Sequence, residues 1–332
     1  MLTVGLIGAG RIGRVHASTI VQDEGSQLVA VADSVDENAK NLAKLYKVNP
    51  RSVDAIFEDN SIEAILIASS TDTHSDFIEK ASIAGKAILC EKPVDLSLAR
   101  AKRCLENTKS NEHLIMMGFN RRFDPNFVAL KKALDGGEIG TAELLSITSF
   151  DPAPPPIDYV KVSGGIFKDM MIHDFDMANF LYGELPKSVF VSASAIIDKK
   201  IGALGDYDTA VATLKYRDGR LAVIKNSRRA TYGYDQRIEV LGSKGLLQVQ
   251  NMVENSMVKS TEMGVESSKP EYFFLERYKS AYQNEWTAFV TAVKTKTPMP
   301  VSLSDGIAAL AIAEAAAASA EMGSEVEIAN FL

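Results

Sequence analysis

A glycine-rich loop near the start of the chain constrains its fold more than any other feature. The apolar, β-prone segment Val4–Ile7 leads into Gly8-Ala9-Gly10-Arg11-Ile12-Gly13, and helical spacing begins at once in Arg11–Val21. In this setting the first glycine permits a tight turn, the second lets the backbone approach a pyrophosphate, and the third lets helix and strand pack closely. An unliganded strand–helix turn is the weaker interpretation, because pattern, position and context agree. We therefore predict a dinucleotide-binding βαβ unit.

Strand and helix signals continue to alternate through the first third of the chain. Further strands are predicted at Leu28–Ala32, Ala64–Ser69, Ala87–Cys90 and Leu114–Gly118. The helices predicted between them are Asn38–Tyr46, His74–Ala84 and Ser97–Lys109. Strands that alternate with helices favour a parallel, doubly wound sheet. We therefore assign residues 1–120 to an α/β domain that binds the dinucleotide.

The pattern changes after residue 120, where strands follow one another with few helices between them. The predicted strands are Ala142–Phe150, Ser188–Ile197, Thr209–Tyr216, Leu221–Ser227, Gln236–Leu241 and Leu246–Gln250. Residues 217–220 and 242–245 fit hairpin turns. The predicted helices are Pro125–Leu134, Asp169–Leu181, Tyr272–Lys294 and Ser304–Met322. This indicates an α+β domain over residues 121–332, built on a large, mostly antiparallel open sheet.

Composition and charge exclude several classes of protein. With 46% hydrophobic and 24% charged residues, the 332-residue chain has the make-up of a globular protein of two domains. Its net charge of −7 and the lack of a basic run argue against nucleic-acid or membrane partners. Cys90 and Cys104 lie in apolar or helical segments and are expected to be reduced. We find neither a signal-peptide pattern nor an apolar run of about 18 residues, so a cytoplasmic protein is expected.

The end of the second predicted strand carries the residue expected to select the dinucleotide. Asp33 lies about 20 residues beyond Gly13, where an acid accepts hydrogen bonds from the adenosine ribose hydroxyls and repels a 2′-phosphate. Ser34 follows it, so no arginine stands there to bind that phosphate. We therefore predict NAD rather than NADP. The alternative role for Asp33 is that of a turn or helix-capping acid.

Two segments are candidates for the reacting groups. Glu91-Lys92-Pro93 directly follows a predicted strand, and ligands of doubly wound sheets bind at the carboxyl ends of strands. Pro93 fixes the backbone there, which favours a held Lys92 over an ordinary solvated lysine. Asp169 and His173 are four residues apart and would share one face of a helix. In that arrangement the carboxylate can orient the imidazole as a general base.

The remaining histidines and acids have plainer interpretations. His16 and His113 are expected to be structural, whereas His74 follows a predicted strand and is a candidate cofactor contact. A cluster of acids and one histidine could in principle hold zinc: Asp169, His173, Asp174 and Asp176. However, no cysteine or second histidine has ligand spacing nearby, and Lys92 already supplies positive charge. A metal site is therefore disfavoured.

Over essentially its whole length, the chain resembles the glucose-fructose oxidoreductase/inositol dehydrogenase/rhizopine catabolism (Gfo/Idh/MocA) family. The glycine loop and Glu91-Lys92-Pro93 are typical of the whole family. Three later motifs are closer to its inositol dehydrogenase branch: Gly118-Phe119-Asn120-Arg121-Arg122-Phe123-Asp124, the segment from Gly164 to Asp176, and Tyr232-Gly233-Tyr234-Asp235. The resemblance implies an N-terminal Rossmann domain and NAD-dependent oxidation of a ring hydroxyl of a cyclic polyol.

The resemblance also implies roles for individual residues. In the matching catalytic positions, His173 accepts the hydroxyl proton, Lys92 stabilises the developing alkoxide, and Asp169 positions His173. The positions that line the polyol pocket are matched by Arg121, Asp151 and Tyr234. The implied cofactor contacts are Gly8, Gly10, Arg11, Ile12, Gly13, Asp33, Ser34, Thr71, His74 and Glu91. A homotetramer formed through the C-terminal sheet is also implied.

The substrate and the class of function have alternatives at this point. Oxidation of myo-inositol to 2-keto-myo-inositol is favoured, with scyllo-inositol or glucose as the other candidate substrates. The loop Asp151–Pro156 differs from that of the best-known members and borders the pocket, so it bears on which ring configuration is preferred. A non-catalytic NAD-binding sensor is a third hypothesis. The joint presence of Lys92, Asp169 and His173 speaks against it, because binding alone needs no base.

Overall fold

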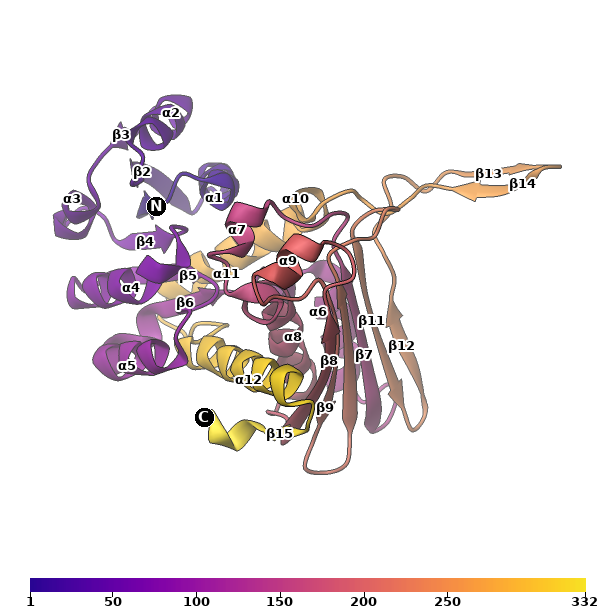
Figure 1. Ribbon diagram of the computed structural model, residues 1–332. Helices are drawn as coiled ribbons and strands as arrows, with labels where there is room; N and C mark the ends of the chain where they lie inside the picture. The colour runs from indigo at the N-terminus through magenta and orange to yellow at the C-terminus, as the bar shows by residue number, and fades with distance from the viewer. The chain divides into compact units, whose positions relative to one another are not determined.

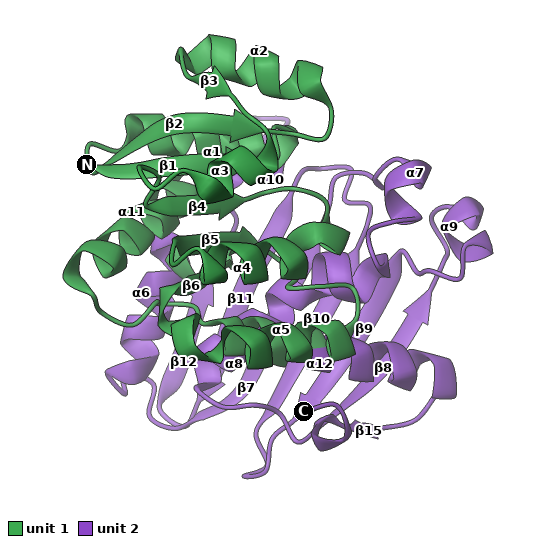
Figure 2. Ribbon diagram, turned by 90° about the vertical axis from the view of Figure 1, so that its left-hand side faces the viewer, with its two compact units in different colours: residues 1–123, 280–310 green, residues 124–279, 311–332 purple.

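The chain forms two compact units in the computed structural model, which describes residues 1–332. Unit 1 comprises residues 1–123 and 280–310, and unit 2 comprises residues 124–279 and 311–332 (Figure 2). This arrangement differs from the division expected at residue 120, which places residues 280–310 in the second domain. Local sequence patterns report helices and strands but not the tertiary packing that returns this segment to unit 1.

Unit 1 is built on a six-stranded parallel sheet with the order β3-β2-β1-β4-β5-β6. Its strands are β1 (Leu2–Ile7), β2 (Ser26–Ala32), β3 (Asn49–Pro50), β4 (Ala64–Ile67), β5 (Ala87–Glu91) and β6 (Ile115–Gly118). The direction of winding reverses between β1 and β4, and sheets of this kind bind ligands at such a point, beyond the carboxyl ends of the strands. The predicted parallel, doubly wound sheet is confirmed.

Helices flank the strands of unit 1, as Figure 1 shows. They are α1 (Arg11–Gln22), α2 (Asp36–Tyr46), α3 (Val53–Glu58), α4 (His74–Ile83), α5 (Leu98–Thr108) and α11 (Lys279–Thr295), of which Lys279 belongs to unit 2. Three 3-10 turns complete the unit, at Thr71–Thr73, Lys109–Leu114 and Asn120–Phe123. Strand β4 is buried along its whole length, as expected for a parallel sheet that is covered on both faces.

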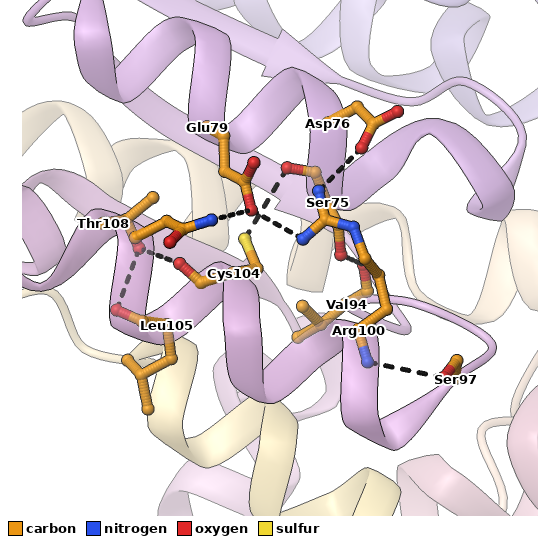
Figure 3. Close-up of polar contacts among 10 residues, drawn as sticks. Ser75, Asp76, Glu79, Val94, Ser97, Arg100, Cys104, Leu105 and Thr108 are labelled. Atoms are coloured by element: carbon orange, nitrogen blue, oxygen red, sulfur yellow. Dashed lines mark hydrogen bonds and ion pairs between the residues drawn. The ribbon is translucent and has the colours of Figure 1, made fainter.

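Polar contacts fasten α4 to α5 on the surface of unit 1 (Figure 3). The Arg100 guanidinium donates to Asp76 and to Glu79, at 2.6 Å in each case. Beneath this cluster the Cys104 thiol contacts the Ser75 carbonyl oxygen at 3.6 Å, and burial raises the pKa of Cys104 to about 12. Cys104 and Cys90 are both free and buried, so neither thiol is a reactive group.

The late segment of unit 1 is held by contacts with residues far away in the sequence. Trp286 on α11 is 1% exposed, and its Nε1 donates to Ser26 Oγ at the start of β2, at 2.8 Å. Beyond the helix, the Met117 amide in β6 donates to the Val301 carbonyl oxygen at 3.1 Å. These contacts explain why residues 280–310 belong with the parallel sheet.

Unit 2 is built on a seven-stranded mixed sheet with the order β12-β11-β7-β10-β9-β8-β15. Its strands are β7 (Ala142–Phe150), β8 (Ser188–Ser194), β9 (Thr209–Lys215), β10 (Leu221–Ser227), β11 (Asp235–Gly242), β12 (Gly245–Val249) and β15 (Val326–Glu327). All neighbouring pairs are antiparallel except β7 and β10. The predicted open, mostly antiparallel sheet is confirmed, as are the hairpins at residues 217–220 and 242–245.

One face of this sheet is covered by helices and the other is exposed. The helical elements of unit 2 are α6 (Pro125–Asp135), α7 (Ile157–Val160), a π-helical turn (Phe167–Met171), α8 (Ile172–Tyr182), α9 (Lys199–Ala203), α10 (Phe274–Arg277), the later part of α12 (Leu303–Met322) and a 3-10 turn (Ile328–Asn330). Helices α6 and α8 pack against the sheet (Figure 1). Along β9, Ala210, Ala212 and Leu214 are buried, whereas Val211 between them is 42% exposed.

Besides several short elements that the sequence analysis does not predict, the late part of the chain differs from the expectation in three respects. A hairpin of β13 (Val258–Thr261) and β14 (Gly264–Ser267), entirely exposed, is missing from the prediction. The helix expected over Tyr272–Lys294 is divided into α10 and α11 at Tyr278. Helix α12 is long and apolar enough to cross a membrane by length and composition, contrary to the expected lack of such a run. However, 61% of its most apolar window is buried inside the protein, as in the core helix of a globular domain.

Candidate active site

The glycine loop between β1 and α1 is shaped by the backbone of the protein itself. Gly8 has a φ of +104°, and a Cβ there would lie 2.3 Å from the Ala68 carbonyl oxygen. A Cβ at Gly13 would lie 1.9 Å from the Gly8 carbonyl oxygen. At Gly10, in contrast, a Cβ would meet nothing within 4 Å. The first and third glycines are therefore required by the fold, while the second opens onto free space.

That free space fits the pyrophosphate of a dinucleotide. Gly10 is the N-cap residue of α1, and no side chain caps this helix end. The first-turn amides and the positive end of the helix dipole thus face outward, and they form the usual binding site for a phosphate group. The donors and the open approach at Gly10 are those that NAD requires.

Asp33 fastens the glycine loop to the end of β2. Its Oδ2 accepts a hydrogen bond from the Ala9 amide at 2.6 Å, and its Oδ1 accepts one from the Val35 amide at 2.8 Å. The turn-acid role weighed for Asp33 is therefore present in the structure. A carboxylate oxygen has more than one lone pair. The predicted contact with the ribose hydroxyls is compatible with these bonds and stays a prediction.

Glu91, the last residue of β5, holds the loop that follows this strand through contacts with His16 and the Lys92 amide. His16 Nε2 on α1 lies 2.8 Å from Glu91 Oε1, and the Lys92 amide donates to Glu91 Oε2 at 3.3 Å. Burial opposes ionisation of this carboxyl, but His16, Lys92 and His74 outweigh it and hold the pKa of Glu91 below its usual value. The structural role expected of His16 is thus that of a partner for Glu91.

His74 holds the same loop from the other side. Its Nδ1 lies 2.8 Å from the Pro93 carbonyl oxygen, and its Nε2 lies 3.2 Å from the Ser69 carbonyl oxygen. The ring is 1% exposed, and burial lowers the pKa of His74, outweighing the two carbonyl contacts that raise it. This geometry gives His74 an anchoring role, and the cofactor contact expected from the sequence stays a prediction.

The other candidates in unit 1 lie at the same edge of the sheet. Ser34 follows β2, Thr71 follows β4, and Lys92 follows β5. Arg11 and Ile12 begin α1 directly after the glycine loop. Arg121 lies in the 3-10 turn that follows β6 and is 5% exposed. The carboxyl ends of parallel strands meet at one edge, which explains why residues so dispersed in sequence lie there.

The candidates in unit 2 gather at one end of the mixed sheet. Strands β7 and β10 run parallel, and their last residues, Phe150 and Ser227, are paired. The Asp151 amide donates to the Ser227 carbonyl oxygen at 2.9 Å, so the segments that follow these two strands stay together. Strand β11 begins opposite Phe150 at Asp235, which brings Tyr234 to the same edge.

Asp169 lies in the π-helical turn Phe167–Met171, directly before α8. The helix expected over Asp169–Leu181 therefore begins with a wider π-helical turn, and the shared face predicted for Asp169 and His173 stays a prediction. Asp169 Oδ1 accepts a hydrogen bond from the Tyr159 hydroxyl at 2.8 Å, and its Oδ2 lies 3.5 Å from Arg228 Nη1. Sequence reasoning missed Tyr159 and Arg228, since no motif marks either one.

Asp174 has a structural role rather than that of a metal ligand. Its Oδ1 accepts a hydrogen bond from Ser149 Oγ at 2.6 Å, and its Oδ2 accepts one from Asn226 Nδ2 at 2.7 Å. These contacts fix α8 on β7 and β10 with a fully buried carboxylate. No three His, Cys, Asp or Glu side chains gather in a way that could hold a metal ion.

The Tyr232–Asp235 motif is held by contacts among its own members. The Tyr232 hydroxyl donates to Asp235 Oδ2 at 2.5 Å, and Arg237 pairs with the same carboxylate. Burial, with the hydrogen bond to Asp235, raises the pKa of Tyr232 to about 12. Tyr234 is 5% exposed, and its ring meets that of Tyr278 edge to face at 6.0 Å.

A reversing parallel sheet with this glycine loop and an open helix end defines a dinucleotide-binding protein. Comparison with known families agrees: residues 2–119 match the model of an oxidoreductase family with an NAD-binding Rossmann fold, and residues 127–248 match the GFO/IDH/MocA C-terminal domain. The chain belongs to the GFO/IDH/MocA family, and unit 1 contains its NAD-binding Rossmann fold.

Individual relatives match over nearly the full length. The inositol 2-dehydrogenase of Rhizobium meliloti (strain 1021) is 48% identical over 98% of both chains. The myo-inositol 2-dehydrogenase of Thermotoga maritima is 44% identical, also over 98% of both. The crystal structure of a myo-inositol dehydrogenase from Corynebacterium glutamicum superposes with a TM-score of 0.95, at 40% identity and 98% coverage of both chains.

Proposed function

We propose that this protein is an inositol 2-dehydrogenase, which oxidises myo-inositol to 2-keto-myo-inositol with NAD⁺ as the acceptor. The observation that carries this function is the 48% identity to an inositol 2-dehydrogenase over 98% of both chains. The residues needed for binding and for proton transfer are also present in this chain, which supports an enzyme over a sensor.

The chemistry requires removal of a hydride from carbon 2 and of a proton from its hydroxyl group, with formation of a C=O bond. Bound NAD⁺ supplies the hydride acceptor. His173 takes the hydroxyl proton as the general base. The Lys92 ammonium stabilises the negative charge that develops on the oxygen, and the Asp169 carboxylate orients the imidazole. Lys92 belongs to unit 1, and Asp169 and His173 belong to unit 2.

Recognition of the ring calls for polar groups around it. Each hydroxyl that is removed from water needs a hydrogen-bond partner, because an unsatisfied buried polar group costs about 1–3 kcal/mol. Asp151 and Tyr234, at the active edge of the mixed sheet, and Arg121, beyond β6, supply a carboxylate, a phenol and a guanidinium. The loop that begins at Asp151 is where a preference between ring configurations would arise.

The test is the formation of NADH, followed by absorbance, from NAD⁺ and a panel of myo-inositol, scyllo-inositol and glucose. We expect the highest kcat/KM with myo-inositol and a much lower value with NADP⁺. A higher value with scyllo-inositol or glucose would reassign the substrate. Tight NADH binding without turnover of any polyol would favour the sensor over the enzyme.

We also propose that the exposed face of the mixed sheet is the contact between subunits of a homotetramer. Apolar side chains are 36–46% exposed along its strands: Leu144, Phe190, Val211, Leu221, Leu241 and Leu246. An apolar patch of this kind on a protein surface is typical of a protein–protein interface. Light scattering after size exclusion should give four chains for the wild type and for Val211→Thr, and fewer for Val211→Asp. A monomeric wild type would contradict the proposal.

A further inference from the structure

Unit 2 contains, beside Asp169, a buried cation that the proposed reaction does not use. Arg228 follows β10 and is 1% exposed. Its Nη1 lies 3.5 Å from Asp169 Oδ2, and its Nη2 lies 3.6 Å from Asp206 Oδ2. One guanidinium therefore lies between two carboxylates, one of which is Asp169, the group proposed to orient His173.

The chain is shaped locally to bring these groups together. Gly165 has a φ of +80°, and a Cβ there would lie 2.8 Å from Asp206 Oδ1. The Ile166 amide donates to that same oxygen at 2.9 Å. The missing side chain at Gly165 thus lets Asp206 reach the segment that leads into the π-helical turn. On the other side, the Arg228 amide donates to the Asp208 carbonyl oxygen at 2.8 Å.

The energetics do not favour such an arrangement for stability alone. A guanidinium remains charged in proteins, and a buried charge is tolerated only when it is paired. Arg228 Nε and Nη2 make no hydrogen bond within the protein, so the two ion pairs carry the compensation. A buried ion pair with incomplete hydrogen bonding adds little to stability compared with apolar packing. A role in placing Asp169 accounts for it better.

We propose that Arg228 is a positioning residue for the proposed reaction, because it fixes the Asp169 carboxylate in a single orientation. The Tyr159 hydroxyl on α7 also donates to that carboxylate, and Tyr159 is 41% exposed. An exposed contact of this kind competes with water, whereas Arg228 is out of reach of solvent. Asp206 pairs with the far side of the guanidinium, so Arg228 is held from both sides. This inference rests on the proposed function of Asp169.

The test is a double-mutant cycle of Arg228→Met with Asp169→Asn, measured as kcat for myo-inositol oxidation at saturating NAD⁺. Arg228→Met should lower kcat by about 10- to 100-fold in the wild-type background, as expected when a reacting group is misplaced. In the Asp169→Asn background it should cost less than about threefold, because residues that act through one another are not additive. The matched control is Arg229→Met, the same change at the next residue, which is exposed.

Further measurements separate this role from a merely structural one. NADH affinity by calorimetry should be unchanged in Arg228→Met, and Arg228→Lys, which keeps the charge, should recover part of kcat. Wild-type kcat in Arg228→Met, or an equal loss in both backgrounds, would overturn the inference. If Arg228→Met does not fold, the same cycle with Arg228→Lys decides. A wild-type enzyme that oxidises no inositol would instead overturn the proposed function, and this inference with it.

Discussion

The two units build their parts of the site in different ways. In unit 1 the essential geometry is made by the backbone of residues 8–13, since close main-chain contacts require glycine at Gly8 and Gly13, while Gly10 opens onto free space. In unit 2 the proposed catalytic carboxylate is held by side chains from separate segments, Tyr159 and Arg228. A site made by backbone leaves a readable motif, whereas a site made by long-range side-chain contacts does not.

The largest loss of kcat should come from a change at Lys92, which combines the features of both units. Lys92 is placed by a local motif, yet it acts through its own side chain. Lys92→Ala should reduce kcat by about 10³-fold, the size expected when a charge that stabilises an oxyanion is lost. Steady-state NADH formation measures this, and NADH affinity by calorimetry should hardly change. Lys44→Ala, an exposed lysine on α2, is the control. Near-normal turnover would remove Lys92 from the chemistry.

The next effect tests the base in unit 2. His173→Asn keeps a polar side chain of similar size but cannot accept the proton, so kcat should fall by about 10²-fold. In the wild type, kcat/KM for oxidation should rise with pH through one ionisation near neutrality and then level off, since the imidazole must be neutral to act. The pH–rate profile of the variant should lose that ionisation. If it keeps the wild-type profile, another group is the base, and Tyr234 would be tested next.

A pair of glycine variants tests the role of the glycine loop of unit 1 directly. Gly10 has a φ of −69°, so Gly10→Ala fits the fold, but its Cβ would enter the space proposed for the pyrophosphate. The Kd for NADH should rise about tenfold, or ~1.4 kcal/mol, with Tm unchanged. Gly13→Ala should instead lower Tm, because its Cβ would collide with the Gly8 carbonyl oxygen. If both variants changed the Kd and Tm in the same way, the distinction between a glycine required by the fold and one that faces the ligand would be wrong.

The smallest effect concerns the exposed contact to Asp169. Tyr159→Phe removes one hydroxyl that donates to the carboxylate. A hydrogen bond of this kind contributes about 0.5–1.5 kcal/mol, so kcat should fall by only about two- to tenfold. Initial rates for Tyr159→Phe and Arg228→Met, measured side by side, show which of the two contacts with the Asp169 carboxylate matters more for kcat. A larger loss for Tyr159→Phe would mean that the exposed contact governs Asp169 and the buried one does not.

Sequence patterns gave most of unit 1 because its signals are local. The strand–loop–helix at Gly8, the alternating elements and the strand-end position of Lys92 all depend on short spacings. At the π-helical turn that contains Asp169 the sequence predicts an ordinary helix, since apolar periodicity does not reveal one inserted residue. Arg228 lies 59 positions from Asp169, and only the mixed sheet brings the two together. The packing of residues 280–310 in unit 1 likewise depends on long-range contacts that local sequence patterns do not show.

The packing of residues 280–310 in unit 1 can be followed by the fluorescence of Trp286. Trp286 is the only tryptophan of the chain and is buried. Its indole N–H donates to Ser26, the first residue of β2. Its fluorescence therefore reports whether the late segment has docked on the early one. During refolding, a blue shift of the emission would time the closing of unit 1 between two residues that lie 260 positions apart in the sequence. No label needs to be introduced for such a measurement.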